Sequence, residues 1–226
     1  HSSDWIMDIG DPFSLKKDSP ENNKFLYSFI NTYFEKKYYT KCKRIIFTHY
    51  ESMLFHQEYF NLDPKKLIIG HPISKIDLNK ISSSEKYNYS GVPVNIGYFG
   101  IFTEGIREPT NYLNSICKDS EIDFHHYWYI NNESKKYFIS YLNNKQHTFK
   151  NLVPRTEAID LMINKMHILL SIGNKNTYQL PSKVIEYISL GKPVLHFAEI
   201  SNDPMYKFEN LFNNLKIINR NTQKED

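Results

Sequence analysis

Residues 179–194 read QLPSKVIEYISLGKPV. Pro181 suits the first turn of a helix, where a missing backbone N–H costs nothing, and Gly191 suits the left-handed residue at its end. The free N–H groups at such a helix start form an anion site, to which Lys183 adds a mobile positive charge. Glu186 stands one turn further among apolar side chains, so its carboxylate needs polar partners. Two sugar hydroxyls would satisfy it, and so would a nearby lysine.

A second glycine-bearing segment lies earlier, where the strand pattern Asn95–Phe99 runs directly into Gly100. In open α/β sheets, ligands bind at the carboxyl ends of the strands. Gly100 would let a phosphate approach the backbone without a Cβ in the way. Arg107 follows in the loop before the next helix, where a guanidinium can clamp a phosphate with two parallel hydrogen bonds. The spacing is not a full GxGxxG, so a tight turn with a solvated arginine is the alternative.

Apolar runs of strand length alternate with helical patterns around these two segments. Strands are predicted at 94–99, 123–129, 148–153, 167–172, 193–198 and 214–218, and helices at 109–118, 133–142, 156–164, 182–190 and 204–212. Six strands with helices between them make a complete doubly wound unit with a parallel sheet.

A shorter β-α-β-α-β series precedes this unit. Strands are predicted at 5–7, 44–48 and 66–70, with helices at 26–34 and 51–60. A polar stretch without periodicity follows, as expected of a linker. The sequence therefore predicts an α/β chain with a partial first domain (1–75), a linker (76–93) and a complete second domain (94–226).

The stretch from Leu180 to Leu195 resembles the donor-binding signature of GT-B glycosyltransferases, in particular the retaining family 4 enzymes that build bacterial surface glycans. The segments Gly97–Arg107 and Leu152–Ser171 resemble the first strand and the middle of the same domain, so the resemblance covers about residues 94–200. It implies a GT-B-like fold, with a complete Rossmann-like C-terminal domain and the second half of an N-terminal one. It also implies a hexosyl- or glycosyltransferase that moves a sugar from a nucleotide-diphospho-sugar to a glycan or lipid-linked acceptor.

The resemblance also implies roles for individual residues. Glu186 would hold the donor ribose, Arg107 would meet the diphosphate, and the loop before the helix would meet the diphosphate or the sugar. The turn at Val153 would border the base. The implied donor-binding residues are Gly100, Arg107, Val153, Pro154, Pro181, Ser182, Lys183 and Glu186.

Residues 1–75 resemble the last three strands of the acceptor-side domain, as a pattern more than as a motif. Asp11, His49 and His71 fall at predicted strand ends and are the acceptor-side candidates, with a structural role as the alternative. The first half of that domain and the C-terminal helix that crosses back have no counterpart. We therefore expect a chain truncated at both ends, inactive in transfer by itself, which forms homo-oligomers through residues 1–75.

One position departs from the family pattern. Many members carry a glutamate eight residues before the one matching Glu186, where this chain has Tyr178. That glutamate contacts the transferred sugar, so the catalytic residue, the donor sugar and the stereochemical outcome are left open. A non-catalytic GT-B-like subunit that binds or stabilises a partner transferase is the alternative function. An epimerase or hydrolase acting on the same nucleotide sugars is a third.

The amino-acid composition excludes several other classes of protein. With 40% hydrophobic and 23% charged residues in a chain of 226, the protein is globular. Lys and Arg number 28 against 25 acidic residues, a balance that argues against nucleic acid. No apolar run is long enough to span a membrane, although peripheral contact with the membrane's inner face stays open. Cys42 and Cys117 form no CxxC pair, which favours a cytoplasmic protein. We expect no metal and no cofactor, with the nucleotide sugar as substrate.

Overall fold

A computed structural model describes residues 4–10, 13–14, 25–70, 93–116, 124–142 and 144–219. The chain divides into two compact units. The first comprises His1–Ile73 with Asn176–Leu180, and the second comprises Ser74–Lys175 with Pro181–Asp226. The paired strands of both units are parallel, which confirms the predicted α/β class. Apart from Pro93, the predicted linker lies outside the described residues.

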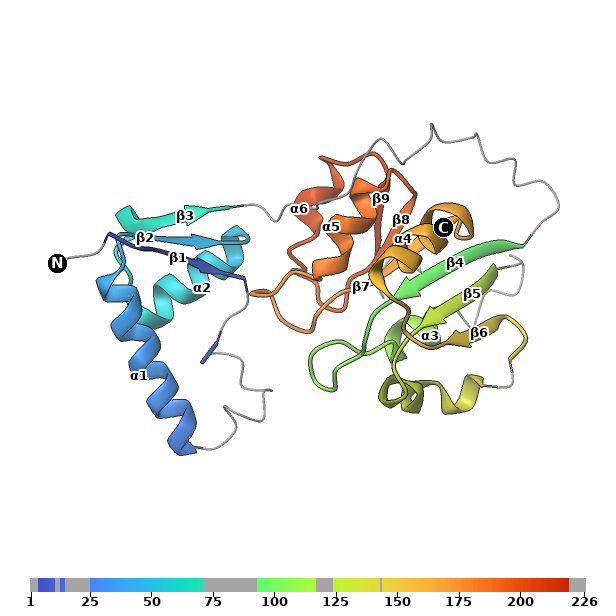
Figure 1. Cartoon of the computed structure of the whole chain (residues 1–226), viewed down its shortest axis with the longest axis horizontal. Helices are drawn as coiled ribbons and strands as arrows, with labels where there is room; N and C mark the ends of the chain where they lie inside the picture. The colour runs from blue at the N-terminus through green and yellow to red at the C-terminus, as the bar shows by residue number, and fades with distance from the viewer. Residues whose placement is uncertain are drawn as a thin grey trace. The chain divides into compact units, whose positions relative to one another are not determined.

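Within its described residues, the first unit contains a three-stranded sheet in the order β1 (Ile6–Ile9), β2 (Arg44–Phe47) and β3 (Leu67–Ile69). The helices α1 (Phe25–Lys41) and α2 (Tyr50–Phe60) connect these strands, and a short 3-10 turn, η1 (Pro64–Lys66), leads into β3. Figure 1 shows α1 and α2 below the sheet. Successive right-handed crossovers that move in one direction place their helices on one face. The core lies between them and includes Ile45, Phe47, Tyr39 and Phe60.

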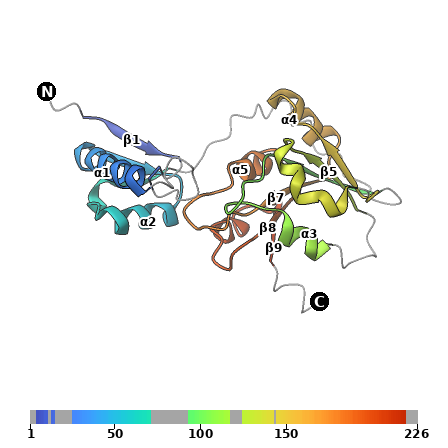
Figure 2. The same cartoon turned by 90° about the horizontal axis from the view of Figure 1, so that it is seen from below.

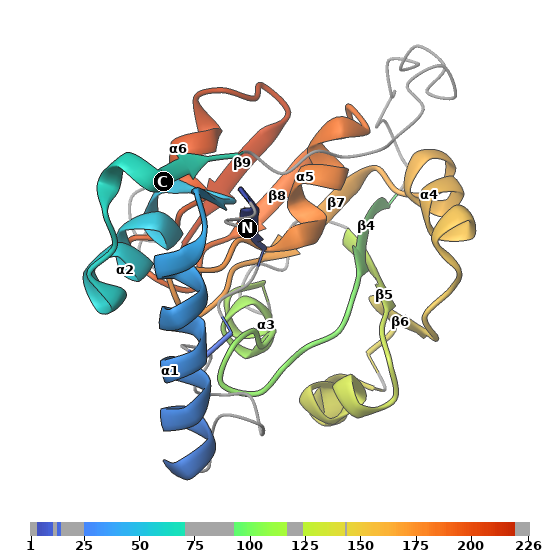
Figure 3. The ribbon, with the colours of Figure 1, turned by 60° about the vertical axis from the view of Figure 1, so that its left-hand side comes forward.

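The described residues of the second unit form six strands in the order β6-β5-β4-β7-β8-β9 (Figure 3). Their bounds are β4 (Val94–Phe99), β5 (Phe124–Tyr129), β6 (His147–Lys150), β7 (Ile168–Ile172), β8 (Val194–Phe197) and β9 (Leu215–Ile218). Strand order reverses between β4 and β7. Loops that leave those two strands diverge, and the crevice between them is where doubly wound sheets bind ligands.

Helices cover both faces of this sheet. They are α3 (Thr110–Ile116), η3 (Glu133–Tyr141), α4 (Arg155–Asn164), α5 (Ser182–Ser189) and the single turn α6 (Tyr206–Glu209). Figure 2 shows α3 on one side of the strands and α4 and α5 on the other. The larger core cluster packs alternate strand residues such as Tyr98, Leu170 and Trp128 against Leu113 and Phe138.

Several elements differ from their predicted form. Helix α1 continues beyond the predicted 26–34 to Lys41, because Tyr39 in its last turns is buried in the core of the first unit. Residues 133–141 form a 3-10 helix, because the Ser134 N–H donates to Asn131 Oδ1 at 3.1 Å and its Oγ accepts from the Phe102 N–H at 2.9 Å, which fixes a tight first turn. Strand β6 stops before the loop that leads to Pro154, which has no N–H for a ladder. The helix predicted at 204–212 is reduced to α6.

Candidate functional site

The carboxyl end of β4 is fastened to α5 by one buried tyrosine. Tyr187 Oη donates to the carbonyl of Phe99 at 3.1 Å and accepts from the Phe99 N–H at 3.1 Å. The next residue, Gly100, donates its N–H to the Tyr129 carbonyl at 3.0 Å, and a Cβ there would meet Tyr98 Oη at 3.2 Å. The helix that bears Glu186 is thereby fixed against the strand that ends at Gly100.

Arg107 is anchored to the other strand of the switch point. Its loop folds back as a tight hairpin, in which Thr103 and Arg107 exchange backbone hydrogen bonds and Gly105 has a φ of 75°. The Arg107 Nε donates to Asn174 Oδ1 at 2.9 Å, just beyond β7. The Lys175 N–H donates to the Ile106 carbonyl at 2.7 Å and closes the same junction. The guanidinium therefore lies where the loops after β4 and β7 meet.

Glu186 is the centre of a charged cluster on α5. Its Oε1 accepts from Arg155 Nε at 3.0 Å and from Arg155 Nη2 at 2.9 Å, while its Oε2 accepts from Lys183 Nζ at 3.0 Å. Burial would raise the pKa of the carboxyl, but the hydrogen bonds and charges of Lys183 and Arg155 outweigh it and hold that pKa below its ordinary value. Glu186 is therefore ionised at neutral pH, with two cations on one anion.

Two helix starts supply this cluster. Ser182 and Lys183 open α5 directly after Pro181, and Arg155 opens α4 directly after Val153 and Pro154. The turn predicted to border the base thus stands beside Glu186. Sequence reasoning did not single out Arg155, although its place at the first helical position after that turn was a usable signal. The N–H groups of both helix starts favour an anion.

Tyr187 also links the Arg107 and Glu186 groups electrostatically. Burial raises the pKa of the Tyr187 hydroxyl, Tyr98 and Glu186 raise it further, and Arg107 lowers it. Within the described part of the chain, no hydrogen bond or ion pair joins Arg107 directly to Glu186. The structure therefore places two polar groups around one tyrosine, without direct contact.

The acceptor-side candidates belong to the first unit. His49 is buried, with Nε2 at 3.0 Å from the Thr177 carbonyl oxygen and Nδ1 at 3.0 Å from Thr48 Oγ1. Asp11 and His71 lie outside the described residues. Tyr178, which stands where many family members have a glutamate, stacks on Phe55 with ring centroids 4.6 Å apart.

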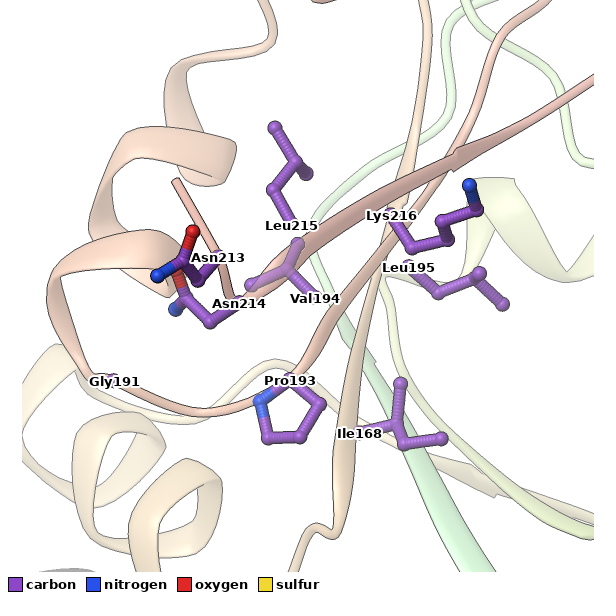
Figure 4. A pocket seen from close by; sticks show the side chains of 9 residues that line it. All are labelled: Ile168, Gly191, Pro193, Val194, Leu195, Asn213, Asn214, Leu215 and Lys216. Carbon is purple, nitrogen blue, oxygen red and sulfur yellow. The ribbon is translucent and has the colours of Figure 1, made fainter. Parts of the chain in front are cut away.

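A cavity of about 450 Å³ opens at the opposite edge of the second sheet. Figure 4 shows its lining, which includes Ile168, Val194 and Leu215, the first residues of β7, β8 and β9. A neighbouring cavity of about 380 Å³ shares Gly191, Asn213 and Asn214 with it. Because the strands are parallel, both cavities lie at their amino ends, away from Gly100 and Arg107.

Two features are absent from the described residues. No helix in those ranges is long and apolar enough to cross a membrane. Nor do three His, Cys, Asp or Glu side chains come together there in a way that could hold a metal ion.

No protein-family model matches the chain, and no curated protein matches it in sequence. Solved structures do. Anabaena HepE in complex with UDP and glucose aligns over 86% of this chain and 53% of its own, with 11% identity and a TM-score of 0.55. The apo lipopolysaccharide outer core galactosyltransferase WaaB covers 70% of this chain and 44% of its own, with 10% identity and a TM-score of 0.49. Arabidopsis thaliana UGT89C1 complexed with UDP covers 96% and 54%, with 12% identity and a TM-score of 0.44.

This chain thus spans about half the length of the solved structures it matches. At these identities the similarity concerns the fold. HepE, whose TM-score is the highest of these three, matches the fold of this chain over 86% of this chain's residues. The chain therefore has the mixed α/β fold of the GT-B glycosyltransferases.

Proposed function

We propose that the protein is a glycosyltransferase, which binds a nucleotide-diphospho-sugar at the carboxyl ends of the strands of its second sheet and moves the sugar to an acceptor. The acceptor would be a glycan or lipid-linked molecule of a bacterial surface polysaccharide pathway, in the cytoplasm or at the inner face of the membrane. This acceptor class rests on the resemblance of residues 180–195 to the family 4 signature. The observation that carries the proposal is the ionised Glu186, held between Arg155 and Lys183 at two helix starts.

Electrostatics would supply the chemistry. In the transfer, the bond between the anomeric carbon and the diphosphate oxygen breaks, a bond from that carbon to an acceptor hydroxyl oxygen forms, and the hydroxyl proton passes to the departing diphosphate or to water. Negative charge grows on the departing diphosphate. We expect Arg107, Lys183 and the N–H groups that open α5 to stabilise that charge, since Arg107 lies at the junction of the loops after β4 and β7 and Lys183 lies in the first turn of α5. We therefore propose that the protein's own cations, without a metal or cofactor, receive the leaving group.

A thermal-shift panel with UDP, GDP, ADP and their sugars tests binding, and calorimetry then measures affinity. UDP comes first because HepE was solved with it. Since Glu186→Ala also releases two cations, inorganic diphosphate is titrated in parallel to isolate the contribution of the ribose. The variant should bind the nucleoside diphosphate more weakly, relative to diphosphate, by about 1–3 kcal/mol, the scale of a lost charged hydrogen bond.

The matched control is Asp160→Ala, which removes an exposed carboxylate from α4 whose partner is Asn164. It should leave both affinities unchanged. If the ratio of the affinities for nucleoside diphosphate and inorganic diphosphate is the same in Glu186→Ala and the wild type, the ribose role of Glu186 is wrong. If none of the nucleotides shifts the melting temperature of the wild type, the donor site itself is wrong.

The alternative is a non-catalytic subunit that binds nucleotide and stabilises a partner transferase. Tyr178 favours it, because this position holds an aromatic ring packed on Phe55 and no carboxylate. Nucleotide binding by the full-length protein, without sugar transfer to any acceptor, would support the subunit. Transfer by the full-length protein would reject it.

A further inference from the structure

The cations around Glu186 stand between its carboxylate and the solvent. The Glu186 side chain is 9% exposed, whereas the side chains of Arg155 and Lys183 are 58% and 41% exposed. Both carboxylate oxygens already accept hydrogen bonds, and Oε1 takes two from the same guanidinium. Oε2 accepts only from Lys183 and keeps one acceptor site, whereas Oε1 is filled by the Arg155 guanidinium. A ribose whose two hydroxyls donate to both oxygens of Glu186 must therefore displace Arg155 from Oε1.

A neutral hydroxyl is a poor competitor in such an exchange. The fork of Nε and Nη2 makes charge-assisted bonds that are stronger than those of a neutral donor. A diphosphate changes the balance, because it offers the displaced guanidinium another anion in the same electropositive region. The Arg155 backbone is fixed as the first residue of α4, but its exposed side chain is long enough to exchange partners.

We propose that Arg155 is a specificity-determining residue that occupies the ribose position of Glu186 until a phosphate-bearing ligand draws it away. It thereby makes the site select nucleoside diphosphates against free nucleosides. This inference rests on the proposed function, since it assumes that Glu186 receives a ribose.

The test compares a nucleoside diphosphate with its parent nucleoside. The pair is UDP and uridine, GDP and guanosine, or ADP and adenosine, whichever diphosphate the wild type binds. In Arg155→Ala the nucleoside should bind about tenfold more tightly than in the wild type, equivalent to about 1.4 kcal/mol. The affinity for the nucleoside diphosphate should stay equal or fall. The preference for the nucleoside diphosphate over the nucleoside should therefore drop by about tenfold or more. Arg155→Lys, which keeps the charge but not the fork, should lie between the two.

Lys165→Ala is the matched control, because it removes an exposed cation from the far end of α4. It should leave the preference unchanged. In the Glu186→Ala background, Arg155→Ala should give no gain for the nucleoside, since the occupied carboxylate is gone. A merely structural role for Arg155 would weaken both ligands alike and lower the melting temperature.

Two failures are distinguishable. In the first failure, Glu186→Ala weakens the binding of nucleoside diphosphate relative to inorganic diphosphate, but Arg155→Ala leaves the affinity for the nucleoside unchanged or lower. The inference about Arg155 is then wrong, and the donor site stands. If no diphosphate of the panel binds the wild type, both the donor site and the role of Arg155 are overturned.

Discussion

At the scale of single residues, two buried histidines of the second sheet make the stability of the protein depend on pH. His126 on β5 and His147 on β6 stack with ring centroids 5.1 Å apart. The Tyr112 hydroxyl lies 2.9 Å from His126 Nε2, and Trp128 Nε1 donates to His147 Nδ1 at 2.9 Å. Burial, with the neighbouring His147 and His125, lowers the pKa of His126 to about 3. Burial, with His125, lowers the pKa of His147 to about 4.

Both pKa values lie below the ordinary value of 6.5, so between that pH and about 4 the unfolded chain binds more protons than the folded one. The contribution of these histidines to the free energy of unfolding is therefore complete above pH 6.5. It is lost as the pH decreases below that value, by about 1.4 kcal/mol per histidine and pH unit. The melting temperature should decline steeply from pH 7 to 4. Because glutamine does not titrate there, a His126→Gln/His147→Gln variant should melt lower at pH 7 but lose less on acidification. Equal losses in both proteins would show that these histidines do not govern the acid response.

Residue chemistry was partly predictable from the sequence. The need of Glu186 for polar partners followed from its apolar neighbours, and Lys183, one turn away on the same helix, is one of these partners. Arg155 approaches from another helix, 31 residues earlier, and no local pattern encodes that contact. The ligand roles of the eight donor-binding candidates remain predictions, namely those of Gly100, Arg107, Val153, Pro154, Pro181, Ser182, Lys183 and Glu186.

At the scale of elements, Tyr187 fastens α5 to β4. Tyr187→Phe keeps the ring but leaves the buried N–H and carbonyl of Phe99 without the hydroxyl. We expect a loss of about 1–3 kcal/mol in the free energy of unfolding, measured by urea denaturation. Tyr127→Phe is the control, since that hydroxyl forms no hydrogen bond among the described residues and its loss should cost less than about 0.5 kcal/mol. Equal stabilities for the two variants would contradict the fastening role.

Gly173 allows β7 to pass close to a buried network. A Cβ at this position would collide with Asp203 Oδ2, and it would lie 3.2 Å from the Glu199 backbone nitrogen. Asp203 Oδ2 lies 3.2 Å from His196 Nε2, and His196 Nδ1 lies 3.0 Å from Ser171 Oγ. Gly173→Ala must therefore shift Asp203 or β7, at a cost of about 1–3 kcal/mol. Because Asn174 follows and holds Arg107, diphosphate affinity should fall as well; an unchanged melting temperature and affinity would refute this coupling.

The order of elements was predictable from the sequence because each has a strong local pattern. Gly191 has the positive φ of 69° that its place after α5 indicated. The 3-10 form of η3 was not predictable, because its first turn depends on Phe102, a residue 32 positions away that bonds to Ser134. The order of the strands was not predictable from local patterns either, because it depends on pairing between distant segments, such as the pairing of β4 with β7.

At the scale of the whole molecule, apolar side chains lie exposed on the first unit. They include Phe29, Tyr33 and Phe34 on α1, together with Ile6 and Ile68 on the sheet. Among the described residues, the sheet ends in the strands β1 and β3, and an edge strand without a partner can pair with another chain. We therefore predict self-association through residues 1–75.

Sedimentation at increasing concentration measures this. The wild type should form dimers or larger species, and Phe29→Asp with Ile68→Asp should shift it toward monomer. Leu211→Asp, which changes an equally exposed leucine of the second unit, should not. A wild type that stays monomeric at every concentration would show that this surface does not drive association.

The measurement that tests the central claim most directly is a map of backbone amide chemical shifts during titration with the nucleoside diphosphate that stabilises the protein most. In the second sheet, the charged cluster lies on the side of the carboxyl ends of the parallel strands, and the cavities lie at their amino ends. We predict that the largest changes fall on Gly100, Arg107, Lys183 and Glu186. Changes confined to Gly191, Asn213, Asn214 and Leu215, at the amino ends of the strands, would contradict the proposed donor site.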